Sequence, residues 1–176
     1  LAVYHYSANN PIKYVDPDGR DIRVGNYAAA WRLLKNTSVG GTANWLFNDW
    51  LENIFSSNGA NLNFRTGTRA GYLGTCGGNY ISKTRTYQWG AVIKTERYQV
   101  LISADINIKE GLTKHQQVLV MAHEIGHAER LPVEINDLNR GYTQRTLSRW
   151  RYEENTGFRN QFNVASELYQ SAAGPY

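Results

Sequence analysis

The sequence predicts an α+β fold in which helices pack against a small mixed sheet. Residues 118–125 form an apolar helical pattern, residues 80–108 are rich in Tyr, Val, Ile and Thr, and residues 27–35 and 42–55 have helical composition. The chain has 176 residues, of which 41% are hydrophobic, and this is enough for one domain with a substantial core.

The N-terminal half predicts two helices followed by a loop. Residues 27–35 are rich in Ala and Leu. After Gly40 and Gly41, residues 42–55 place Trp45, Leu46 and Trp50 at helical spacing, which indicates an amphipathic core helix. Residues 56–79 are rich in Gly, Asn, Ser and Thr, so we expect them to be largely loop.

Residues 80–108 are the strand region, with a hairpin expected near residues 94–97. A strand that precedes a catalytic helix can hold an extended substrate by main-chain pairing, if it lies at an edge of the sheet. The sequence does not indicate which strand forms that edge.

The next helix has a defined start and a buried face. Thr113 followed by Gln116 is typical of a capping box, and Gly111 closes the preceding segment. Val118, Met121 and Ile125 make this helix too apolar to be fully solvated.

This helix carries the pattern His123-Glu124-Ile125-Gly126-His127. Histidines four residues apart lie about 40° apart around a helix and one turn along it, so both can bind one ion. The intervening Glu124 points toward the same cleft and can take a proton from water there. HExxH on a helix is the zinc-binding pattern of metallopeptidases. A buried helix would carry these imidazoles and this carboxylate inward only with a partner such as a metal ion, since burying them without one is costly.

A catalytic zinc ion needs a third protein ligand and an open position. The candidates downstream are Glu129, Glu134, Glu153, Glu154 and Glu167. Glu129 is too near His127 to reach the same face, and Glu134 follows Pro132. Leu147 and Trp150 set an apolar face on which one member of the Glu153–Glu154 pair would point inward, and helical periodicity slightly favours Glu154.

HEIGHA followed by Tyr152-Glu153-Glu154-Asn155-Thr156-Gly157-Phe158 resembles the zincin effector proteases, a group that includes the clostridial neurotoxin light chains. The resemblance implies a zincin-like fold in which Glu153 is the third zinc ligand. Glu154 would then support a histidine or arginine from outside the set of metal ligands. The group often ends in Arg-x-x-Tyr, whose tyrosine stabilises the oxyanion, and this implies a catalytic role for Tyr176. Ala173 stands where the arginine is expected, and Tyr142 and Tyr169 are competitors for the role.

Residues 4–20 read YHYSANNPIKYVDPDGR, a run of aromatic residues followed by two turn signals. The pattern YxYxxNNPIxYxDPxGR resembles the last segment of the Rhs repeat core, the YD-repeat shell of secreted polymorphic toxins. The resemblance implies a boundary here, with residues 1–20 ending the shell and residues 21–176 forming a toxin domain. Arg20 replaces the leucine that follows DPxG where the family cleaves itself.

Charge and composition narrow the expected partners. The net charge is +4 without runs of Lys or Arg, which indicates a solvated surface, so we do not expect nucleic acid as a partner. No apolar run is long enough for a signal peptide or membrane span, and no membrane partner is expected. Leu1 is not an initiator Met, so we expect a fragment of a longer secreted chain. Cys76 is the single cysteine, which excludes an internal disulfide.

Together these features predict a Zn²⁺-dependent endopeptidase that forms the toxic tip of an Rhs-type protein. We expect His123, His127 and Glu153 to hold the metal and Glu124 to act as general base. The substrate would be a protein in the cytoplasm of the cell that receives the toxin, and a matching immunity protein would protect siblings. The alternatives are a zinc-dependent hydrolase of cell-wall peptides or amides, and a non-proteolytic toxin that targets nucleic acid.

Overall fold

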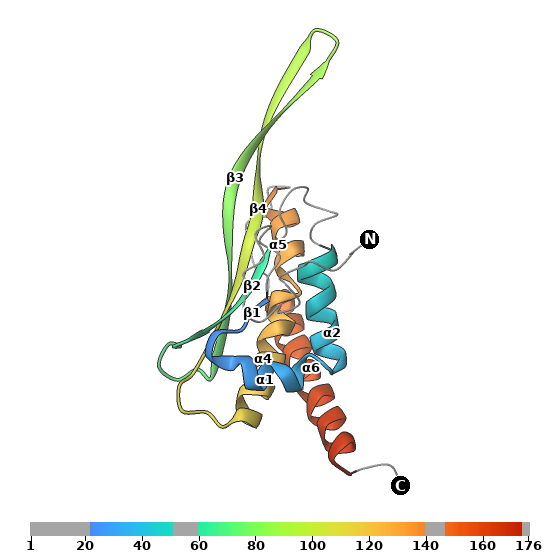
Figure 1. The fold of residues 1–176 in the computed structure, drawn as a ribbon. Helices are drawn as coiled ribbons and strands as arrows, with labels where there is room; N and C mark the ends of the chain where they lie inside the picture. The colour runs from blue at the N-terminus through green and yellow to red at the C-terminus, as the bar shows by residue number, and fades with distance from the viewer. Residues whose placement is uncertain (1–21, 51–59, 140–146, 174–176) are drawn as a thin grey trace, which may run out of the picture.

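The computed structural model describes residues 22–50, 60–139 and 147–173. It contains a four-stranded mixed sheet with helices packed against one face, as Figure 1 shows. This confirms the α+β class. The expected shell boundary at residues 1–20 lies outside the described residues.

The sheet has the order β1-β2-β4-β3. The short β1 (Ile22–Arg23) pairs in parallel with β2 (Asn61–Thr66), and β2 pairs in parallel with β4 (Val92–Ile108). β3 (Gly74–Trp89) pairs with β4 in antiparallel orientation and forms one edge. The prediction of a loop over residues 56–79 was therefore wrong for β2 and for the start of β3.

The two faces of the sheet differ in polarity. Ala104, Ile106 and Ile108 of β4 are fully buried toward the helices. On the other face, the Asp105 carboxylate accepts hydrogen bonds from Asn63 Nδ2 at 2.6 Å and Asn79 Nδ2 at 3.0 Å. One face is thus core and the other is a polar network, as expected for alternating residues of a strand.

The first helices differ in part from the predicted pattern. A 3₁₀ turn, η2 (Gly25–Tyr27), leads into α1 (Ala28–Leu34), close to the predicted helix. α2 (Ser38–Asn44) begins before Gly40, with Thr37 as its N-cap, and continues into the π-helical η3 (Trp45–Trp50). A Cβ at Gly40 would overlap the Leu34 carbonyl oxygen, so the close approach of α1 and α2 requires glycine at this position in α2.

α4 (Lys114–Ala128) is the central helix, and it contacts α1, α2, α6, β3 and β4. α5 (Leu131–Asn139) packs on β4, and the long α6 (Leu147–Ala173) packs along α4 (Figure 1). The main core lies between α4 and the sheet, where Val118, Met121 and Ile125 are fully buried against strand residues such as Ile106.

The β3–β4 hairpin turns at Gly90 and Ala91, where Gly90 has a φ of 58°. The prediction of a turn near residues 94–97 was wrong. That polar run lies in β4, in a part of the strand that is solvated on both sides, so polar residues there do not indicate a turn.

Candidate metal centre

The start of α4 fixes the position of the motif that it carries. The Thr113 hydroxyl accepts a hydrogen bond from the Gln116 backbone N–H at 3.4 Å, and the Gln116 side-chain oxygen accepts one from the Thr113 N–H at 2.9 Å. The predicted capping box is confirmed. It begins the helix three turns before His123, while the apolar face of the helix sets its rotation against the sheet.

The two histidines converge as the motif predicts. Their Nε2 atoms lie 3.2 Å apart. The Glu154 carboxylate of α6 completes the group, with Oε2 at 3.5 Å from His123 Nε2 and Oε1 at 3.7 Å from His127 Nε2. One ligand atom from each of the three residues lies within 4.8 Å of the others, so they could hold a single ion.

These distances fit a zinc-sized ion. Nitrogen and oxygen ligands bind Zn²⁺ at about 2.0–2.2 Å, so two ligands at tetrahedral angles lie about 3.3–3.5 Å apart. The observed separations are 3.2, 3.5 and 3.7 Å. Two imidazoles and one carboxylate would leave a fourth position for water or substrate, which is the arrangement of a catalytic rather than a structural site.

The structure brings Glu154, and not Glu153, to the histidines. Glu154, Phe158 and Gln161 recur at helical spacing and line one cleft with both histidines. Glu153 is 1% exposed and shares the buried side of α6 with Asn160 and Val164. Adjacent residues of a helix point about 100° apart, so the two glutamates face different surroundings. The placement agrees with helical periodicity and differs from the ligand that the zincin resemblance implied.

Two glycines allow α6 to approach α4 closely enough for this contact. A Cβ at Gly126 would lie 2.8 Å from the Gly157 Cα, and a Cβ at Gly157 would lie 2.8–3.0 Å from three ring atoms of His123. Glycine in a helix interior costs about 1 kcal/mol relative to alanine, so close packing explains its presence here. The Phe158 ring, one residue further along, packs edge-on against His123 with centroids 4.8 Å apart.

Glu124 lies beside the cluster in an environment that disfavours its charge. It is 6% exposed. Burial, and secondarily the negative charge of Glu154, raise its pKa to about 7. Burial also lowers the pKa of His123, although Glu154 opposes this shift, and the neutral imidazole that results is the form that binds metal.

The cluster opens into a cleft of about 540 Å³. Its walls come from α4, from α6 and from a stretch that includes Gly71 and Tyr72 before β3 and Gly74 and Cys76 at the start of β3. The composition of this stretch is typical of a loop, so the sequence gives no signal that it lines the cleft. Burial, and secondarily the negative charge of Glu124, raise the pKa of the Cys76 thiol.

The sequence offers three tyrosines as candidates for the residue that stabilises the oxyanion. Tyr176 and Tyr142 lie outside the described residues, and Tyr169 is 77% exposed on α6. Tyr72, which the sequence did not suggest, contributes to the wall of the cleft. It is the phenol that the described part of the chain brings to the cleft.

Comparisons of the chain with protein-family models, with curated proteins and with solved structures found no match. The fold and the cluster therefore define the protein only as an α+β chain with a group of side chains suited to a metal ion.

Proposed function

We propose that this chain is a zinc-dependent endopeptidase of the zincin type. One observation carries the proposal. His123, His127 and Glu154 converge within 4.8 Å at the side of a cleft that also contains the buried carboxylate of Glu124. A metal held there would polarise a peptide carbonyl and lower the pKa of a water molecule.

Each residue then has a role that its surroundings support. Glu124, with a pKa raised to about 7, can accept a proton from the attacking water and return it to the leaving amine near neutral pH. A tyrosine hydroxyl would stabilise the oxyanion, and Tyr72 and Tyr176 are the candidates.

The sheet offers a way to hold the substrate. β3 is the edge strand, and its first residues, Gly74, Thr75 and Cys76, line the cleft. An extended peptide could pair with this edge and pass its scissile bond beside the histidines. This geometry favours a polypeptide substrate.

The biological setting follows from the resemblance of residues 4–20 to the end of an Rhs core. We extend the proposal accordingly: the domain is the toxic tip of a secreted Rhs-type protein and cleaves a protein in the cytoplasm of the recipient cell. A bacterial prey would require a matching immunity protein in the producer.

Metal analysis of matched variants tests the site. We expect one zinc per chain in the wild type and in Glu153→Gln, and loss of zinc in His123→Ala and Glu154→Gln, because only Glu154 faces the histidines. Zinc lost in Glu153→Gln and kept in Glu154→Gln would reverse the ligand assignment. A wild type that takes up no zinc on reconstitution would refute the metal site.

Activity tests the mechanism separately. Glu124→Gln should keep its zinc and lose proteolysis, because the base is removed and the ligands remain. A variant that still cleaves would refute the role of Glu124. A zinc-loaded wild type that releases peptides from peptidoglycan but leaves a protein panel intact would identify a cell-wall hydrolase instead.

A further inference from the structure

The β3–β4 hairpin extends beyond the body of the protein (Figure 1). β2 pairs with β4 only from Ser103 to Ile108, whereas residues 82–89 pair with residues 92–99 across the hairpin. A register shift between Asn79 and Tyr80 marks the point of departure. At about 3.3 Å per residue, the stretch from Val92 to Gln99 reaches about 25 Å outward.

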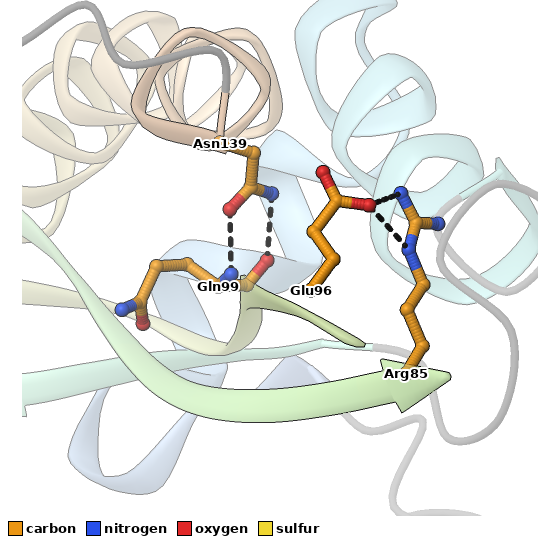
Figure 2. Close-up of polar contacts among 4 residues, drawn as sticks. All are labelled: Arg85, Glu96, Gln99 and Asn139. Carbon is orange, nitrogen blue, oxygen red and sulfur yellow. Dashed lines mark hydrogen bonds and ion pairs between the residues drawn. The ribbon is translucent and has the colours of Figure 1, made fainter. Parts of the chain in front are cut away.

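Specific polar contacts hold the hairpin at Gln99, where it leaves the body, and at Arg85 and Glu96 further out (Figure 2). Asn139 of α5 pairs with the Gln99 backbone like a neighbouring strand: its oxygen accepts from the Gln99 N–H at 2.6 Å, and its Nδ2 donates to the Gln99 carbonyl at 3.0 Å. Further out, Arg85 forms an ion pair with Glu96 at 3.1 Å. The Arg85 guanidinium also lies 5.0 Å from the ring centroids of Tyr87 and Tyr98.

The end of the hairpin exposes apolar residues on both of its faces, with Tyr87, Trp89 and Val92 on one face and Ile93 on the other. Trp89 pairs with Val92 on one face, and Ile93, which pairs with Gln88, lies on the other. The exposed fractions are 89% for Trp89, 67% for Val92 and 66% for Ile93, and Tyr87 is 43% exposed. We call these four residues the tip surface. Exposed apolar groups gathered at one place indicate a site of interaction.

The hairpin as a whole, residues 81–99, is positively charged. Residues 81–99 contain four cations, Lys83, Arg85, Lys94 and Arg97, and Glu96 is their one acidic residue. Residues 81–99 therefore carry a net charge of +3. Lys94 pairs with Tyr87 and is the cation closest in strand register to the turn of the hairpin.

We infer that the hairpin tip docks into an anionic lipid surface. Trp89, Val92 and Ile93 enter the boundary between headgroups and acyl chains, and Tyr87 and Lys94 lie at the level of the headgroups. Trp and Tyr favour this boundary, and basic residues next to an inserted apolar group are attracted to anionic lipids.

Two features favour lipid over a protein groove or a second copy of the chain. A hairpin that packs on a protein surface buries one face, whereas the tip surface exposes Trp89 and Val92 on one face and Ile93 on the other, which suits a medium that surrounds the tip. In addition, two tips brought together would place like charges side by side, whereas an anionic membrane complements them.

Attachment of the hairpin tip to a lipid surface differs from anchoring by a membrane-spanning helix. Among the described residues, no helix combines the length and hydrophobicity needed to cross a bilayer. The absence of long apolar runs led to the expectation that no membrane is a partner. The tip surface is assembled from two short segments that meet only when the hairpin forms.

Vesicle flotation with the purified chain tests this inference. We expect binding to vesicles of phosphatidylcholine and phosphatidylglycerol at 3:1, and at least tenfold weaker binding to phosphatidylcholine alone. Trp89→Ser with Ile93→Ser should weaken binding at least tenfold, and Lys94→Glu several-fold, with the remaining affinity less dependent on salt.

Matched controls separate the tip from exposed groups elsewhere. Phe162→Ser removes an aromatic that is 73% exposed on α6, and Lys109→Glu reverses an exposed charge on the body; both should bind like the wild type. Circular dichroism confirms that each variant is folded. Absence of vesicle binding, or equal binding by the tip double variant, would overturn the inference. Self-association of the wild type that is lost in the double variant, without lipid binding, would instead assign the tip to an interface between copies.

Discussion

Gly157→Ala tests whether the close approach of α6 to α4 positions the metal ligands. The added Cβ would lie 2.8–3.0 Å from Cε1, Nδ1 and Nε2 of His123, whereas ordinary contacts begin near 3.4 Å. The His123 ring or the helix must therefore move by about 0.5 Å. Gly126 of α4 is part of the same close contact, because a Cβ built on it would lie 2.8 Å from the Gly157 backbone.

The expected effects on stability and on binding differ in size. Overpacking costs about 1–3 kcal/mol, and replacing a helical glycine with alanine returns about 1 kcal/mol, so the net loss is about 0–2 kcal/mol. For a chain of this length, that lowers Tm by at most about 8 °C. Disturbing a group that orients a ligand weakens metal binding by about 10–100-fold. Zinc affinity is therefore the more sensitive measurement.

The assay is competition for zinc against a chromophoric chelator, with thermal unfolding of the metal-free protein beside it. Gly41→Ala is the matched control, because Gly41 is an exposed glycine of α2 whose Cβ would meet nothing within 4 Å. It should raise stability by up to about 1 kcal/mol and leave zinc affinity unchanged. Zinc binding by Gly157→Ala at the wild-type affinity would refute the argument that this glycine sets the ligand geometry.

Three further predictions address the base, the helix start and a buried carboxylate. In Gly74→Ala, the new Cβ would lie 2.6 Å from Glu124 Oε1 at the wall of the cleft. Peptidase activity should therefore fall at least tenfold while the zinc content is unchanged. Equal loss of activity and zinc would contradict the argument that Gly74 acts on Glu124 and not on the metal ligands. Thr113→Ala removes the cap of α4 and should lower the free energy of unfolding by about 1 kcal/mol, or about 2–4 °C in Tm, and no change in a thermal melt would show that the cap is dispensable. Burial raises the pKa of Glu129, which accepts a hydrogen bond from Asn160 at 3.0 Å. Because the folded-state pKa lies above the unfolded value, the stability linked to this group is present at low pH and lost as pH rises through the folded pKa. Glu129→Gln keeps a hydrogen-bond acceptor without the charge. In urea unfolding of the metal-free protein, the stability of this variant relative to the wild type should therefore increase from pH 4 to pH 7. A difference in stability that stays constant over this range would contradict the argument.

The local features of the metal centre could be predicted from the sequence because they depend on helix geometry alone. Residues four apart on one helix meet whatever surrounds them, which is why His123 and His127 lie together in the structure. The capping box at Thr113 and Gln116 is equally local. The presence of strands over residues 80–108 followed from their composition.

The remaining features depend on contacts between distant segments. Residues 61–66 became β2 because β1 and β4 supply backbone partners on both sides, which overrode a composition typical of a loop. The choice between Glu153 and Glu154 depends on how α6 is rotated against α4, and the Gly126–Gly157 contact constrains that rotation. A single sequence shows that one of two adjacent glutamates faces inward, whereas the packing of two helices decides which of them reaches the histidines.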